Sequence, residues 1–230
     1  MDAILNPHAS SAPTDKDIVA EANHRIANSL ALLVSMVRMQ ASAAYRRGES
    51  IPPGEARLML EGVAARISTI GHLHRLLSRA PQDGATLLMP HLREVSDSLV
   101  AALSSSQQPV SVLLAGEDCT VLTRQVQPLI LILCEIFINA MKYAHPTGVP
   151  LVMQVDCMPA ADGRLVLTIR DDGIGLPEGF NPAADGGLGM RVIRSLAAEA
   201  GAMLEITSDD LGLSFRFSMP AAAMSRGKVC

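Results

Sequence analysis

Aromatic residues are scarce in this sequence: they make up 3% of the chain, and tryptophan is absent. Charged residues are also few, at 18%, whereas 49% of the residues are hydrophobic. This composition is typical of a globular protein with cores of Leu, Val, Ile, Met and Ala, and it favours helices packed with aliphatic sheets. The 230 residues leave room for two small domains, each with its own core.

Basic residues do not outnumber acidic ones. The formal net charge is −4 and the pI is about 5.8, so we expect no nucleic acid as a partner and a protein instead. Four cysteines occur, but they lack the paired spacing of a zinc site and the density of a disulfide scaffold. They are Cys119, Cys134, Cys157 and Cys230. A reducing cytoplasm is therefore the expected location.

Long hydrophobic runs are missing too. The longest apolar stretch, Leu129 to Cys134, stops at Glu135, and the sequence from Met1 to Pro7 has no basic region followed by an apolar run. We therefore expect no membrane insertion and no signal peptide.

The first third of the chain predicts a helical hairpin. Residues 1–13 show no periodicity and predict a disordered tail. Apolar residues then recur at helical spacing from residue 18 to about 45, and Arg46-Arg47-Gly48 suits a helix end. A second helix is predicted from Glu55 to about Arg79, with an apolar stripe formed by Leu58, Val63, Ile67, Ile70, Leu73 and Leu77. The hairpin, residues 14–80, leaves an apolar face exposed, which predicts a homodimer with a four-helix bundle.

The remainder predicts a two-layer α/β sandwich. We expect residues 81–109 to form a connector and a helix from Met89 to Leu103, and residues 221–230 to form a tail. Between them, residues 110–220 predict strands at 110–114, 151–157, 164–170, 203–207 and 213–219, and helices at 124–144 and 190–200. The whole chain is therefore expected to be α+β, with helices covering one face of a mostly antiparallel sheet.

Three motifs in this second part indicate a nucleotide site. They are Glu135-x-x-x-Asn139-Ala-x-Lys142, Asp171-Asp-Gly173-Ile-Gly175 and Gly186-Gly187-Leu-Gly189. Glu135 and Asn139 lie one turn apart on one helix face, so their oxygens can converge on a hard cation, and Mg²⁺ fits best. Lys142 is placed to reach a phosphate or to stay in solvent, and Tyr143 to edge the base or ribose.

The two glycine-rich motifs follow a strand and precede a helix. Gly173 and Gly175 leave no side chain between the turn after Asp171 and a planar ligand, which suits adenine. Gly187 and Gly189 come before a helix expected near Met190, whose free N–H groups can face phosphate oxygens. Residues 176–185 between the motifs predict a flexible lid over the nucleotide.

A histidine lies on the first predicted helix, within Glu21-x-x-His24-Arg25-x-x-Asn28. With a nucleotide site downstream, His24 is the expected nucleophile for phosphoryl transfer. Glu21, one turn earlier, can hold the Nδ1–H of His24 and direct Nε2 outward. Asn28, one turn later, either orients a water for phosphatase action or is an ordinary surface residue.

The three downstream motifs, in this order, resemble the N, G1 and G2 boxes of the GHKL ATPase superfamily. The helix around His24 resembles the phosphoacceptor box of sensor histidine kinases of the HisKA_2 type, and the resemblance extends from about residue 17 to 220. It implies a Bergerat-type ATP-binding domain in which Asn139 ligates Mg²⁺, Glu135 organises the site and Asp171 accepts a hydrogen bond from the adenine amino group. The family often has an acidic residue after the histidine, where this chain has Arg25. Only about sixteen residues precede the helix, so a separate sensor protein is a possible partner.

The leading functional hypothesis is a two-component histidine kinase. It would autophosphorylate His24 from ATP and transfer the phosphoryl group to an Asp of a response regulator receiver domain. The alternative is a histidine phosphotransfer adaptor with a non-catalytic ATPase-like domain. A third hypothesis, an anti-sigma-factor serine kinase, shares the ATP site but does not need His24.

Overall fold

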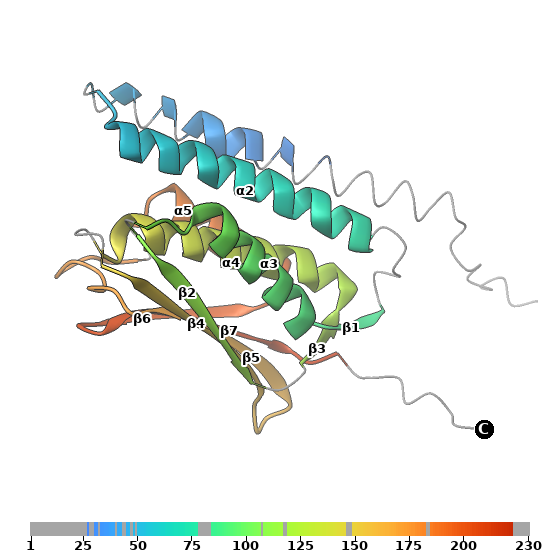
Figure 1. Cartoon of the computed structure of the whole chain (residues 1–230). Helices are drawn as coiled ribbons and strands as arrows, with labels where there is room; N and C mark the ends of the chain where they lie inside the picture. The colour runs from blue at the N-terminus through green and yellow to red at the C-terminus, as the bar shows by residue number, and fades with distance from the viewer. Residues whose placement is uncertain are drawn as a thin grey trace, which may run out of the picture.

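The computed structural model has a helical hairpin on one side, a layer of helices in the middle and a β-sheet on the other side (Figure 1). It describes residue 27 and residues 30–31, 33–39, 41–42, 45–46, 48, 50–77, 84–106, 108–116, 119–145, 149–182 and 185–222. The α+β class and the helices covering one face of the sheet confirm the predicted fold.

The hairpin is formed by a first helix and by α2 (Pro53–Leu77). The described residues from 27 to 46 are helical, and Gly48 follows with a φ of +68° and an N–H that donates to the Tyr45 carbonyl at 3.2 Å. The predicted glycine cap is thereby confirmed. The tail and the predicted start of the first helix lie outside the described residues.

The face that α2 turns inward contains only part of the predicted stripe, including the buried Ile70. Ile67 is 52% exposed, whereas Gly62, Arg66 and Thr69 are buried together with Leu73. These four residues recur at the spacing of one helix face. The predicted stripe counted apolar residues only, so it did not show that the inward face carries a buried arginine whose charge is balanced by another helix.

The sheet has five strands in the order β2 (Val110–Gly116), β4 (Leu151–Pro159), β5 (Arg164–Asp171), β7 (Gly212–Pro220) and β6 (Met203–Asp209). β2 and β4 are parallel, and the other neighbours are antiparallel. Alternate residues of β5 are buried, and Asp171 ends this buried row, after Leu165, Leu167 and Ile169. Its carboxylate therefore faces the helical layer.

A small antiparallel ribbon was not predicted. It pairs β1 (Ala85–Leu87) with β3 (Thr120–Leu122), and three-residue strands show no alternation long enough to detect. The predicted helix at 89–103 is confirmed as α3 (Met89–Leu103), which packs against β2 and against the helix that follows β3.

That helix, α4 (Thr123–Tyr143), lies between the hairpin and the sheet (Figure 1). It contacts α2, α3, the sheet and α5 (Leu188–Glu199). Among the described helices it is the one long and apolar enough to cross a membrane, but 78% of its apolar window is buried inside the protein. Burial on every side accounts for its composition, and α4 is the central core helix of this fold.

Candidate nucleotide site

The N-terminus of α5 lies close to the side chain of Asn139 on α4. A Cβ added to Gly189 would lie 2.9 Å from both the Oδ1 and the Nδ2 atoms of Asn139. Any larger residue here would push the Asn139 side chain aside, and the first and third motifs meet at this point as the sequence predicted. The helix begins slightly earlier than expected, at Leu188.

The start of α5 is open. Gly187 is its N-cap residue, no described side chain caps it, and a Cβ added there would meet no described atom within 4 Å. The first N–H groups of a helix lack partners within the helix and carry the positive end of its dipole. The start of α5 is therefore suited to hold phosphate oxygens.

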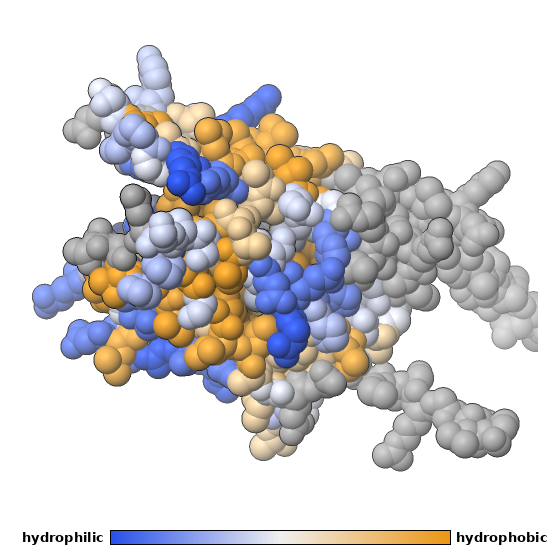
Figure 2. All heavy atoms as spheres, viewed as in Figure 1, coloured by the Kyte–Doolittle hydropathy of each residue, from blue (hydrophilic) through white to orange (hydrophobic). Residues whose placement is uncertain are grey.

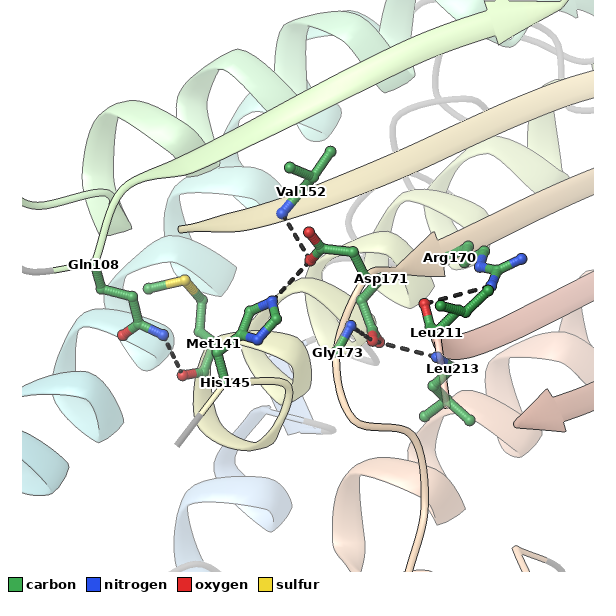
Figure 3. A network of polar contacts seen from close by, with 10 residues as sticks. Gln108, Met141, His145, Val152, Arg170, Asp171, Gly173, Leu211 and Leu213 are labelled. Carbon is green, nitrogen blue, oxygen red and sulfur yellow. Dashed lines mark hydrogen bonds and ion pairs between the residues drawn. The ribbon is translucent and has the colours of Figure 1, made fainter. Parts of the chain in front are cut away.

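Asp171 provides a buried acceptor at the end of β5. Its Oδ1 accepts hydrogen bonds from the N–H groups of Gly173, at 3.0 Å, and Leu213, at 3.3 Å (Figure 3). Burial raises the pKa of this carboxyl, and the two backbone hydrogen bonds act in the opposite direction. A buried carboxyl group beside a turn can accept a hydrogen bond from an exocyclic amino group, as adenine recognition requires.

Gly173 and Gly175 make close contacts within the protein. A Cβ on Gly173 would lie 2.5 Å from the Cβ of Ala144, and a Cβ on Gly175 would lie 2.5 Å from the Ser208 hydroxyl. Gly175 also has a φ of +70°. The glycines thus let the turn pack on the end of α4 and on β6, and their predicted role beside a planar ligand stays a prediction.

Gly212 was not identified as a site residue. A Cβ at this position would lie 1.9 Å from the backbone oxygen of Asp171, so the glycine lets the start of β7 approach Asp171 closely. The next residue, Leu213, supplies one of the two N–H groups that bind the Asp171 carboxylate. The only signal in the sequence was a glycine in the short Asp209-Asp210-Leu211-Gly212 stretch between two predicted strands.

His145, directly after α4, contacts the second motif, and nothing in the sequence indicated this contact. His145 Nε2 lies 2.9 Å from Asp172 Oδ1, which also accepts a hydrogen bond from the Val152 N–H at 3.0 Å. Figure 3 shows His145 beside the turn that carries Gly173. Nearby on α4, Tyr143 is 69% exposed and Lys142 is half-buried.

Glu135 is bound by a residue of another helix, whereas the sequence predicted that it would share a cation with Asn139. Its carboxylate is bound by Arg66 of α2 through two hydrogen bonds, one from Nε and one from Nη2, the latter at 2.8 Å. Within the described ranges, no group of three or more His, Cys, Asp or Glu side chains forms a metal site. The start of α5 and the Asp171 carboxyl suit ATP. In this conformation, however, the predicted Glu135–Asn139 pair does not suit Mg²⁺, because Arg66 holds Glu135. The prediction missed the docking of α2 over α4.

His24, Glu21 and Asn28 lie outside the described residues. Their roles stay predictions.

Comparisons with known families decide the relationship of the chain. Residues 21–106 match HisKA_2, described as histidine kinase, and residues 125–223 match HATPase_c, the histidine kinase-, DNA gyrase B- and HSP90-like ATPase family. The chain belongs to the histidine kinases. The HATPase_c match contains all three motifs of the nucleotide site, and the HisKA_2 match contains His24.

Individual histidine kinases are similar over most of this chain. The blue-light-activated histidine kinase 2 of Erythrobacter litoralis is 25% identical over 204 residues, which cover 88% of this chain and 56% of that protein. The sensor histidine kinase PdtaS of Mycobacterium tuberculosis is 26% identical over 184 residues, covering 78% and 34%. The chain thus spans about half and about a third of these two relatives.

Solved structures show the same fold. The histidine kinase domain of the Erythrobacter litoralis blue-light-activated kinase EL346 has a TM-score of 0.63 at 25% identity, with 90% of this chain and 92% of that chain covered. The longer EL346 structure has a TM-score of 0.68 at 23% identity, with 93% and 62% covered.

Proposed function

We propose that this histidine kinase is an ATP-dependent enzyme of two-component signalling that autophosphorylates His24 and passes the phosphoryl group to an Asp of a response regulator receiver domain. The observation that carries the proposal is the meeting of the three motifs: Asn139 lies against Gly189 at the open start of α5, and a buried Asp171 ends a neighbouring strand. Membership of the family supports kinase chemistry.

In the proposed complex each group has a separate task. Asp171 accepts a hydrogen bond from the adenine amino group, and the N–H groups at the start of α5 hold phosphate oxygens. Lys142 contacts a phosphate, and Tyr143 lies at the edge of the base. Asn139 would hold Mg²⁺, which when bound would neutralise charge on the phosphates. Glu135 would join Asn139 in holding this ion once its carboxylate has left Arg66, with phosphate oxygens and waters as the other ligands.

The reaction itself is a displacement at phosphorus. The Nε2 lone pair of neutral His24 forms a bond to the γ-phosphorus of ATP, the bond from that phosphorus to the bridging oxygen breaks, and ADP leaves. Glu21 holds the Nδ1 proton throughout. In the second step a receiver carboxylate oxygen attacks the same phosphorus and the N–P bond breaks. Asn28, by orienting a water on the receiver, adds phosphatase activity.

A homodimer is part of the proposal. On the first helix, Leu30, Val34 and Val37 are 40–49% exposed and recur at helical spacing, and Leu60 and Ile67 are exposed one heptad apart on α2. Figure 2 shows apolar side chains gathered over the hairpin. A second copy that covers these residues would complete a four-helix bundle. We place the protein in the cytoplasm.

The test is incubation with γ-labelled ATP and Mg²⁺. Label that is stable to alkali and labile to acid, and that is lost in His24→Ala but kept in a matched His91→Ala variant, supports the proposal. Acid-stable label would instead support a serine kinase. Transfer to a purified receiver domain, followed by loss of its label on removal of ATP, tests the kinase and phosphatase steps separately.

The alternative is a histidine phosphotransfer adaptor with a non-catalytic ATPase-like domain. The engagement of Glu135 by Arg66 favours it, because this side chain is then not available to a nucleotide. The adaptor predicts that the purified protein does not bind ATP, which a thermal-shift measurement with and without ATP decides.

A further inference from the structure

A buried ion pair joins the helical hairpin to the nucleotide-binding part of the protein. Arg66 of α2 and Glu135 of α4 are 69 residues apart in sequence, and their side chains are only 4% and 3% exposed. The guanidinium donates to both carboxylate oxygens, which is the strong, bidentate form of this interaction. Glu135 belongs to the motif that the sequence analysis assigns to ATP.

The surrounding contacts place this ion pair within a packed helix–helix interface. A Cβ added to Gly62 would lie 3.5 Å from two side-chain carbons of Ile138 and 3.2 Å from Arg66 Nη1, so the glycine makes room for the arginine. One turn beyond Arg66, the Thr69 hydroxyl lies 3.5 Å from Cys134 Sγ. The ion pair is therefore shielded from water only while α2 stays on α4.

The energetics couple the two partners. Removing one member of a buried ion pair leaves an uncompensated charge, which is strongly destabilising, whereas solvent-exposed partners separate at little cost. Glu135 is thus expected to leave Arg66 only when α2 lifts and water enters. A carboxylate whose two oxygens are held by a guanidinium is also not available as an oxygen ligand to Mg²⁺, which requires close, near-octahedral coordination.

We propose that Arg66 and the Mg²⁺ of the bound nucleotide compete for the Glu135 carboxylate, so that docking of α2 on α4 and loading of the ATP site exclude one another. The inference rests on the proposed ATP site. Because such coupling is reciprocal, metal-bound ATP lifts the hairpin, and a docked hairpin weakens the binding of metal-bound ATP. Arg66 thereby acts as a positioning residue that withholds Glu135 until the nucleotide is present.

The first test compares two arginines of one helix. Arg66→Leu removes the competitor, whereas Arg57→Leu removes an exposed arginine that pairs with Glu61 within α2 at 2.7 Å. ATP affinity is measured by calorimetry with Mg²⁺ and with EDTA. Arg66→Leu is expected to bind ATP about tenfold more tightly than the unmodified protein with Mg²⁺ and equally with EDTA, and Arg57→Leu is expected to change neither. Unchanged or weaker binding by folded Arg66→Leu in Mg²⁺ would overturn the inference.

The second test keeps the ion pair and fixes the interface. Thr69→Cys places a second thiol opposite the native Cys134, whose Sγ lies 3.5 Å from the Thr69 hydroxyl, and a disulfide between them would hold α2 on α4. When this protein is oxidised, Mg²⁺-dependent ATP binding is expected to weaken at least tenfold and to recover on reduction. Equal affinity in the oxidised and reduced states would contradict the competition, and the result does not depend on whether Arg66→Leu folds.

Cys134 offers a third measurement without any change at the ion pair. It is fully buried against Thr69, and burial raises the pKa of its thiol to about 12. Lifting of α2 exposes it, so Mg²⁺ with ATP is expected to speed its alkylation, mapped by mass spectrometry with Cys134→Ser as control. An unchanged alkylation rate at saturating ATP would oppose the inference. Absence of ATP binding in every variant would instead refute the proposed function and, with it, this inference.

Discussion

At the scale of single residues, Asp171 combines a cost in stability with a role in binding. Asp171→Asn keeps an oxygen acceptor for the Gly173 and Leu213 N–H groups and removes a charge whose burial raises the carboxyl pKa. ATP affinity is expected to fall about tenfold, because an amide accepts the adenine amino group less strongly and presents a competing donor. Calorimetry with ATP measures this, and Asp97→Asn, on the exposed side of α3, serves as control.

The raised pKa of Asp171 also sets the sign of a pH effect. The folded state binds this proton more tightly than the unfolded state, so its stability falls as pH rises from the ordinary carboxyl pKa through the raised one. Asp171→Asn removes this loss. The variant's thermal midpoint relative to the unmodified protein is therefore expected to be higher at neutral pH than below pH 4, and a gap that does not grow with pH would contradict the assignment.

Gly189 is the second residue whose replacement separates binding from folding. In Gly189→Ala the new Cβ displaces the Asn139 side chain, which it would otherwise approach to 2.9 Å. We expect about a tenfold loss of Mg²⁺-dependent ATP affinity with an unchanged circular dichroism spectrum. Gly54→Ala, where the Cβ meets no described atom within 4 Å, is the matched control. Equal affinities of the two variants would show that Asn139 does not contribute to binding.

At the scale of elements, periodicity predicted what it can detect. The strands at 151–159 and 164–171 alternate, and α2 to α5 have helical spacing or continuous apolar runs, so each was found to within a few residues. The ribbon of β1 and β3 was missed because its pairing, such as Ala85 with Leu122, depends on contacts far apart in sequence. The ion pair of Arg66 with Glu135 was missed for the same reason, since no local pattern reports a partner on another helix.

The hairpin turn between β6 and β7 gives a prediction at this scale. Gly212→Ala is expected to destabilise the protein by about 3 kcal/mol or more, because φ is +135° and the new Cβ would lie 1.9 Å from the Asp171 backbone oxygen. Gly163→Ala also has a positive φ, of +78°, but meets no described atom within 4 Å, so about 1 kcal/mol is expected. Urea denaturation measures both, and equal losses would mean that the contact with Asp171 contributes nothing.

At the scale of the whole molecule, the hairpin has two different apolar faces. One packs on α3 and α4, a contact that the sequence analysis did not predict. The other face remains open and includes Leu60 and Ile67, which are 72% and 52% exposed. A protein in solution rarely leaves such a stripe uncovered. The sequence-based argument for a dimer therefore applies to the second face only.

Ile67→Glu tests this assignment of faces. A charge placed in a dimer interface must be desolvated, so the variant is expected to be monomeric at concentrations where the unmodified protein is dimeric. Light scattering after gel filtration measures the mass, and Met203→Glu, at a 68% exposed position on β6, controls for added charge alone. Because Ile67 points away from α4, ATP affinity is expected to stay the same in the monomer. A monomeric unmodified protein, or a dimer that survives Ile67→Glu, would remove this face from the assembly.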